Sequence, residues 1–152
     1  MPCCNLQLTR RVLQNIALLV AALSGFASQA EQSLELVPFS QDLDFGVIAN
    51  EDGVCRMNDR GSLIGLAGQS CLGSGSRAIF NVTGTPGSVI NISATGGNNG
   101  MGVSFAPSVS GSLTKVIAAN GSAPLVIAGD LVLQNAKSGQ HAIEYIVCVY
   151  YE

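Results

Sequence analysis

The chain has no tryptophan, a single histidine and few charged side chains. Only 11% of its 152 residues are Asp, Glu, Lys or Arg, less than half of the ~25% usual for globular domains. Its seven Lys and Arg residues are too few to form the basic surface that binds nucleic acid. The one histidine, His141, leaves a catalytic site short of the commonest acid–base group. We therefore expect no enzyme, no catalytic residue and no nucleic-acid partner.

Spacings typical of metal and cofactor sites are missing as well. The sequence contains no C-x-x-C pair, no H-x-x-x-H pair and no D-x-[DN]-x-[DN]-G calcium loop. No glycine-rich stretch stands between a strand and a helix, where phosphate-binding loops lie. We expect no metal and no cofactor. What the chain does have is 18 glycines and 47% hydrophobic residues, a balance that excludes a disordered chain and favours one domain with one core.

Residues 1–30 have the organisation of a secretory signal peptide. Arg10 and Arg11 precede a short apolar run, residues 16–23, and small residues occupy positions −3 and −1 of a cleavage site after Ala30. The run is shorter than the ~20 residues that a membrane span needs, so we expect no integral membrane segment in the mature chain. The sequence predicts export through the periplasm, to the cell surface or as a secreted protein.

Cleavage after Ala30 changes the charge of the chain. Five Lys and Arg residues then face all ten acidic residues, which gives the mature chain a net charge of −5. A mildly acidic exported domain has no special attraction to anionic membranes or nucleic acid. Its segments are an N-terminal extension, residues 31–42, and a domain, residues 43–152.

Short apolar alternations, interrupted by Gly, Asn, Ser and Pro, dominate the mature chain. The segments expected to be strands are residues 43–48, 78–83, 89–94, 103–105, 113–117, 125–133 and 142–151. Gly129 and Asp130 suggest a bulge or bend within the sixth of these. Because turn signals recur every 8–12 residues and no helical stripe follows the signal peptide, the pattern predicts an all-β sandwich of about seven short strands.

Three cysteines remain after cleavage, Cys55, Cys71 and Cys148. They allow three single bridges, and export permits disulfides. We favour Cys55–Cys71, because the two flank a loop-like stretch, residues 56–70, whose closure contributes ~3 kcal/mol in the chain-entropy model. Cys148 lies inside a strand pattern, and is either a small packing residue or the partner in an intermolecular bridge.

The end of the chain carries the strictest alternation. One face presents Tyr145, Val147, Val149 and Tyr151, and the other presents Ile146, Cys148 and Tyr150. A strand without a polar face is expected to be covered on both sides and to have its edge paired. Since the sequence ends one residue later, we expect another element of this chain, or another molecule, to pair with that edge.

Four motifs follow one another along the domain. They are Leu43-Asp44-Phe45-Gly46-Val47-Ile48, Ala78-Ile79-Phe80-Asn81-Val82-Thr83-Gly84, Gly129-Asp130-Leu131-Val132-Leu133, and Gly139 with Val147-Cys148-Val149-Tyr150-Tyr151. In this order they resemble a family of exported bacterial proteins regarded as pilin-like, although His141 stands where that family tends to have Tyr. The penultimate Tyr151, with Gly139 at the fourteenth position from the end, also resembles subunits of chaperone–usher pili.

The resemblance implies an immunoglobulin-like sandwich that lacks its last strand. In such pilins a periplasmic chaperone lends a strand, an outer-membrane usher takes part in assembly, and the N-terminal extension of the next subunit replaces the lent strand. It thus implies a structural subunit of a pilus or fimbria that polymerises with other copies or related subunits by donor-strand exchange. The groove-side residues of the last strand would be Tyr145, Val147, Val149 and Tyr151, and Gly139 would permit the turn into that strand.

A donor segment is expected upstream of residue 43, where Leu34 and Leu36 alternate and would serve as anchors. The same stretch could instead be the first strand of its own sandwich. An alternative of another class is a free-standing secreted or surface binding module for a carbohydrate or protein ligand.

Overall fold

The structure of the chain, a computed structural model, describes residues 32–69 and 71–152, so the expected signal peptide lies outside the described residues. These residues form nine strands and no helix: β1 (Glu35–Gln41), β2 (Gly53–Met57), β3 (Leu63–Leu66), β4 (Ala78–Thr83), β5 (Val89–Thr95), β6 (Val103–Val109), β7 (Thr114–Val116), β8 (Ser122–Leu133) and β9 (Ile146–Tyr151). The all-β prediction is confirmed, with nine strands in place of about seven.

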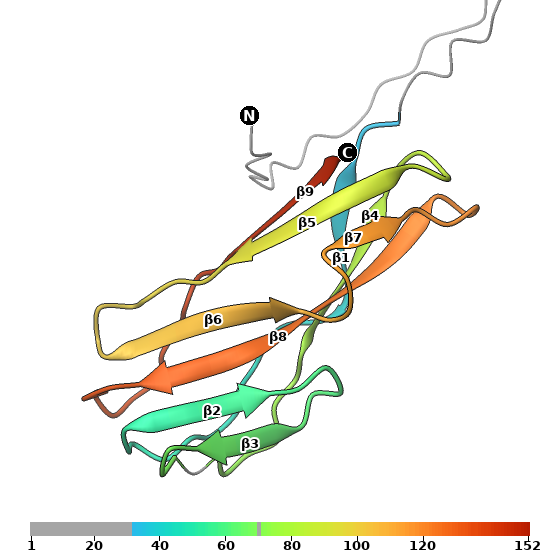
Figure 1. Cartoon of the computed structure of the whole chain (residues 1–152). Coiled ribbons are helices and arrows are strands. Elements are labelled where there is room, and N and C mark those ends of the chain that lie inside the picture. The colour runs from blue at the N-terminus through green and yellow to red at the C-terminus, as the bar shows by residue number, and fades with distance from the viewer. Residues whose placement is uncertain (1–31, 70) are drawn as a thin grey trace, which may run out of the picture.

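The strands form two sheets in which every pairing is antiparallel (Figure 1). The larger sheet has the order β1-β4-β8-β2-β3, and β6 pairs with β8 as well. The smaller sheet has the order β7-β5-β9. Side chains from both sheets meet in one buried cluster, with Ile90 and Ile92 from β5 and Leu125 and Ile127 from β8. The predicted β-sandwich is therefore present.

Two buried clusters make up the core between the sheets. The first consists of Ala78, Val82, Ile90, Ile92, Ile117, Ala123, Leu125 and Ile127. The second consists of Phe45, Cys55, Met57, Phe105 and Ala128. Tyr145 packs against both clusters, and its ring meets that of Phe105 edge to face, with centroids 5.6 Å apart. Each fully buried aliphatic or aromatic side chain contributes about 1.5–3 kcal/mol, so these clusters supply most of the stabilisation.

β8 is the strand on which the larger sheet is built. Its first half pairs with β4 and its second half with β2, while β6 pairs with residues 127–133. The change of partner falls at Gly129, whose φ is +144°. A Cβ at this position would collide with the carbonyl oxygen of Ala106. The strand stays continuous where the sequence suggested a bulge or bend, because a glycine allows this close approach.

The sequence-based expectation of a loop between the paired cysteines, residues 56–70, is wrong. Instead of a loop, this region contains part of β2, a turn and the edge strand β3. The turn is held by Asn58, whose side-chain oxygen accepts hydrogen bonds from the backbone N–H groups of Arg60 and Ser62, both at 2.9 Å. A four-residue strand on an edge buries too few side chains to show a periodic pattern.

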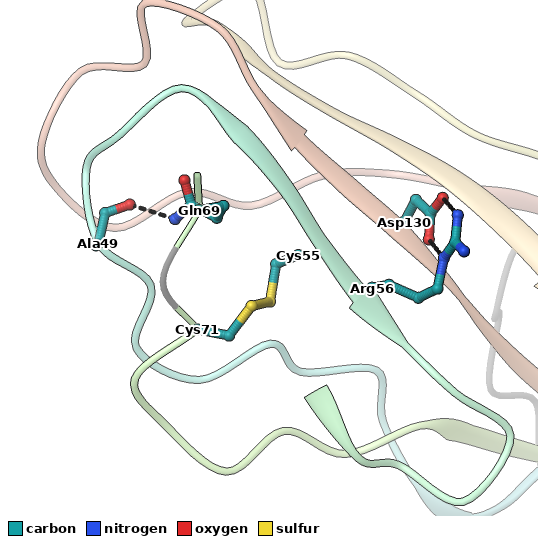
Figure 2. The surroundings of a disulfide bond; sticks show 6 residues. All are labelled: Ala49, Cys55, Arg56, Gln69, Cys71 and Asp130. Carbon is teal, nitrogen blue, oxygen red and sulfur yellow. Dashed lines mark hydrogen bonds and ion pairs between the residues drawn. A yellow bond between two sulfur atoms is a disulfide. The ribbon is translucent and has the colours of Figure 1, made fainter. Parts of the chain in front are cut away.

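The Cys55–Cys71 disulfide is confirmed, and Figure 2 shows it joining β2 to the segment that follows β3. The Cα atoms of the two cysteines are 6.0 Å apart. Beside the disulfide, buried Gln69 donates a hydrogen bond of 2.6 Å from Nε2 to the carbonyl oxygen of Ala49 (Figure 2). The disulfide and this hydrogen bond hold the segment after β3 against both β2 and the connection that precedes it.

Other strand boundaries also differ from the prediction: β6 extends to Val109 instead of residue 105, and β8 starts at Ser122 instead of residue 125. Residues 43–48 are not a strand but make two isolated bridges, Asp44 with Ser76 and Ile48 with Cys71. The reason is a turn at Gly46, whose φ is +62° and whose N–H donates to the Asp44 carboxylate at 2.8 Å. β9 starts at Ile146 rather than at residue 142.

Candidate functional site

Two edge strands, β1 and β9, border the same opening of the sandwich. β1 ends the larger sheet and β9 ends the smaller one, and no ladder joins them within the described residues. Figure 1 places the C-terminus beside the start of β1. At the other end, the charge of Asp42, just after β1, acts on Tyr145, just before β9. The two strands therefore run in opposite directions along what we call the groove.

The groove is lined by side chains that pack on the core but stay partly exposed. They are Leu34 and Leu36 on the β1 side, and Tyr145, Val147, Val149 and Tyr151 on the β9 side. Several inward-facing residues of the interior strands are fully covered: Val82, Ile90 and Leu125 are each 0% exposed. An interior strand has neighbours on both edges, whereas β1 and β9 have one each, so this row remains half-buried.

The structure thus brings together the four terminal-strand residues that the sequence singled out. Their outward neighbours are not covered by the described part of the chain: Ile146 is 63% exposed and Tyr150 is 55% exposed. Cys148, in the same outward row, is half-buried and lies opposite Ser93 of β5. The expectation that β9 is covered on both sides is therefore not met by residues 32–69 and 71–152.

Tyr151 closes one end of the groove. Its hydroxyl accepts a hydrogen bond from the Thr85 N–H and donates one to the Gln32 carbonyl oxygen, both at 2.8 Å. Gly84, which is buried, makes room for this ring, because a Cβ there would crowd the Tyr151 hydroxyl. The penultimate tyrosine therefore joins β9 to the β4–β5 turn and to the chain entering β1.

Tyr145 marks the other end of β9. Burial raises the pKa of its phenol above the usual value of 10.0, and the nearby negative charge of Asp42 raises the pKa further. Both causes favour the neutral form, because an ionised phenol would lose water contacts and meet a carboxylate. The Tyr145 end of the groove is therefore apolar, with an acid at its edge.

A cavity of about 420 Å³ extends beyond Tyr145, between the β1–β2 connection and the β8–β9 connection. Its apolar lining includes Phe45, Ile48, Phe105, Leu131 and Ile143. Asp44, Lys137 and His141 are among its polar lining residues. A hydrogen bond of 3.1 Å from Asn50 Nδ2 to Ser138 Oγ joins the two connections beside the cavity. Sequence reasoning missed this cavity, because its walls come from segments with little regular structure.

His141 holds the β8–β9 connection in place through both of its ring nitrogens. Its Nε2 lies 2.6 Å from the Lys137 carbonyl oxygen, and its Nδ1 lies 2.9 Å from Asn99 Nδ2. The amide oxygen of Asn99 accepts from the N–H groups of Met101 and Val103, which fixes the orientation of that side chain. Nδ1 is thus an acceptor and the proton is assigned to Nε2. Both ring nitrogens are used within the chain.

The structure places the expected donor anchors, Leu34 and Leu36, on the β1 side and the expected turn glycine, Gly139, between β8 and β9. Leu34 and Leu36 pack on the core of their own sandwich, next to a strand that pairs with β4. This arrangement corresponds to the alternative in which the stretch is the chain's own first strand. Gly139 has a φ of +139° in the β8–β9 connection, a conformation that favours glycine.

One ion pair lies away from the groove, on neighbouring strands β2 and β8 of the larger sheet. Arg56 donates two hydrogen bonds of 2.7 Å to the Asp130 carboxylate (Figure 2). These bonds are the main cause of a lowered pKa of Asp130 and a raised pKa of Arg56. The Arg56–Asp130 ion pair lies near the surface, and both carboxylate oxygens of Asp130 are bonded to Arg56. These features are typical of a structural contact between strands.

Within residues 32–69 and 71–152, no group of three His, Cys, Asp or Glu side chains could hold a metal ion. The same residues contain no helix long and apolar enough to cross a membrane. Comparison of the chain with protein-family models, with curated proteins and with solved structures finds no match.

Proposed function

We propose that this chain is a structural subunit of a bacterial pilus or fimbria that accepts a strand from another molecule in the groove between β1 and β9. In this proposal the fold is an immunoglobulin-like sandwich without its last strand. The observation that carries the proposal is that β9 pairs with β5 on one edge only. No strand of the described residues pairs with its other edge, and its inward apolar row is half-buried. Strand addition uses such an edge, with main-chain hydrogen bonds for affinity and pockets for alternate side chains.

The composition of β9 supports strand addition at this edge. Natural edge strands are usually protected by charged residues, proline or bulges. β9 has six residues and contains neither proline nor a charged side chain. β1, across the groove, carries Pro38 and an irregular register between Pro38 and Gln41. An incoming strand therefore has an uninterrupted ladder available on β9 and an interrupted one on β1.

The free energy gained by filling the groove is comparable to the free energy of unfolding of a single domain. Completing the burial of four or five apolar side chains at ~1.5–3 kcal/mol each gives on the order of 10 kcal/mol before the cost of ordering. Single domains are stable by only about 5–15 kcal/mol. An empty groove would thus leave the subunit poorly stable and prone to association through its edge, which is why a chaperone that lends a strand belongs to the proposal.

The proposed partners follow from this requirement. A periplasmic chaperone would fill the groove after export, an outer-membrane usher would take part in assembly, and a strand from a pilus subunit would then replace the chaperone strand. The signal peptide that the sequence predicts at residues 1–30 agrees with this route. A donor role for Leu34 and Leu36 would require β1 to leave the sandwich in which those leucines are packed.

A fused strand tests the proposal. We would extend the full chain after Glu152 by a two-residue Asn-Gly turn and an alternating apolar strand, with a control strand of the same length that has Ser at the inward positions. The apolar fusion is expected to be a monomer with a higher melting temperature, whereas the parent chain and the Ser fusion associate. Equal melting temperatures and a monomeric parent chain would contradict strand acceptance.

The cavity beyond Tyr145 favours a second candidate, a free-standing binding module. Its volume of about 420 Å³ lies within the ~300–1,000 Å³ typical of small-ligand sites, and it has both apolar and polar walls. This candidate predicts a stable monomer that binds a carbohydrate or other ligand without any added strand. Glycan-array binding by the unfused monomer, lost in the variant Phe45→Ala, would favour it over the pilus subunit.

A further inference from the structure

We infer that the strand this groove accepts is basic and belongs to a different polypeptide, rather than to a second copy of this chain. The inference rests on the proposed function and adds the chemistry of the partner. It is carried by the distribution of charge around the groove and along the chain itself.

Acidic side chains flank both ends of the groove, on the β1 side and on the β9 side. They are Glu35, Asp42 and Asp44 on the β1 side, and Glu144 and Glu152 on the β9 side, and all five are exposed. None of them forms an ion pair within 4 Å among the described residues, where Arg56 and Asp130 make the pair. Two cations lie beside Asp44: Lys137 lines the same cavity, and Arg77 is next to Ser76, which pairs with Asp44. The groove therefore has a net negative border.

The acids stand where an inserted strand would pass. Asp42 acts on the phenol of Tyr145, Asp44 lines the cavity, and Glu144 precedes Tyr145 directly. Glu152 follows Tyr151 at the opposite end. In an extended strand every second side chain points away from the core, so these side chains would meet the acidic border. Lys or Arg at those positions is attracted to it, and Asp or Glu is repelled.

A second copy of this chain cannot supply such a strand from its N-terminal region. The sequence contains no Lys or Arg between Arg11 and Arg56. The segment before and within β1 instead carries Glu31 and Glu35, together with Pro38, which cannot donate to a ladder. Its leucines are also packed in their own sandwich. Both charge and packing therefore favour a strand from another polypeptide over the N-terminal strand of a second copy.

Synthetic peptides test the inference on the full chain purified after export. Three labelled peptides of about 11 residues would share Val and Leu at inward positions and carry Lys, Ser or Glu at outward positions. A fourth would copy residues 31–41 of this chain. Binding is measured by fluorescence anisotropy at low salt, about 50 mM NaCl, and at about 1 M NaCl, where charges are screened beyond ~3 Å.

We expect the Lys peptide to bind roughly tenfold more tightly than the Glu peptide at low salt, with Ser between them, and this ratio to fall toward one at high salt. The copy of residues 31–41 should bind no better than the Glu peptide. In the variants Asp42→Asn and Glu144→Gln the preference for Lys should shrink. The control Asp59→Asn, in the β2–β3 turn and outside the set of five acids, should leave it unchanged.

The outcomes distinguish failure of the basic-strand inference from failure of strand acceptance itself. Equal binding of the Lys and Glu peptides, or tight binding of the copy of residues 31–41, would overturn the inference and leave strand acceptance standing. If no peptide binds at either salt concentration, the groove does not accept strands, and both the inference and the proposed function are wrong.

Discussion

At the residue scale, two tyrosines define the ends of β9 in different ways. The hydroxyl of Tyr151 is satisfied by two backbone groups, from Thr85 and Gln32. Tyr145 contributes its ring to both core clusters and keeps its phenol near Asp42. Tyrosine suits such positions because it combines a large apolar body with a polar tip.

The hydroxyl of Tyr151 should contribute measurably to stability. Replacing it in Tyr151→Phe leaves the Thr85 N–H and the Gln32 carbonyl oxygen without this partner, which is expected to lower the free energy of unfolding by about 1–2 kcal/mol. Urea denaturation measures the loss. In the matched control Tyr150→Phe, whose hydroxyl has no hydrogen bond among the described residues, the change should be near zero. Equal effects in the two variants would contradict the role of the Tyr151 hydroxyl bonds.

The raised pKa of Tyr145 makes stability depend on alkaline pH. In the unfolded chain this phenol ionises near its ordinary value of 10.0, whereas the fold holds it neutral at higher pH. Its contribution is therefore fully present below pH ~10 and is lost as the pH rises toward the folded-state pKa. Urea midpoints of the parent chain should fall faster above pH ~10 than those of Tyr145→Phe. Parallel curves for the two proteins would show that the phenol does not titrate differently in the fold.

At the element scale, β8 and the β2–β3 hairpin organise the larger sheet. β8 is long enough to pair with three strands, and Gly129 allows the backbone of β6 to approach it closely. The hairpin is joined to the segment after β3 by the disulfide. Gly129 and the disulfide are both local features, and each can be removed by one or two substitutions.

The glycine of β8 is expected to be intolerant of substitution. Gly129→Ala combines a φ of +144° with a collision against the Ala106 carbonyl oxygen, and should destabilise the domain by about 3 kcal/mol or more. Gly87→Ala provides the comparison, since its φ is +82° with nothing within 4 Å of the added Cβ, and should cost only about 1–2 kcal/mol. Thermal denaturation of both variants separates collision from backbone strain. A smaller loss at Gly129 than at Gly87 would contradict this account.

The disulfide should stabilise the sandwich by closing the chain around the hairpin. The cysteines are 16 residues apart, and a loop of that size corresponds to ~3 kcal/mol in the chain-entropy model. The double variant Cys55→Ala/Cys71→Ala should lose about this amount in urea denaturation. Added reductant should destabilise the parent chain similarly and leave the double variant unaffected. A reductant effect on the double variant would assign the loss to another thiol.

At the scale of the whole molecule, the sandwich is completed unevenly. Its centre is closed by residues from β4, β5 and β8, while the side between β1 and β9 retains a half-buried apolar row. A single chain therefore contains both a well-formed core and an incomplete edge.

Hydrogen exchange should reveal this gradient. Amides of β4, β5 and β8 lie in interior strands and are expected to exchange only by global unfolding. Amides on the outer edge of β9 are expected to exchange by local opening, faster by roughly two orders of magnitude or more. Mass-spectrometric exchange measures both, and the apolar fusion strand described above should protect β9. Protection of β9 equal to that of β8 in the parent chain would show that its edge is already occupied.

The class of fold and most strand positions follow from the sequence, whereas the disulfide was the favoured one of three possible bridges. Alternation in 78–83 and 89–94 predicts strands because side chains on one face of each must be buried, a local consequence of a period of two. The strict alternation after Tyr145 likewise identified the row that lines the groove. A loop-like stretch favoured the correct cysteine pair, although the structure has a β-hairpin there.

Tertiary structure alone decided which edges remain open and what surrounds them. Residues 43–48 alternate like a strand, but a turn at Gly46 diverts them to line the cavity. That β1 and β9 border one groove, with Asp42 beside Tyr145, depends on strand order in two different sheets. Strand order is set by long-range pairing and packing, and these leave no periodic signal in the segments that they bring together.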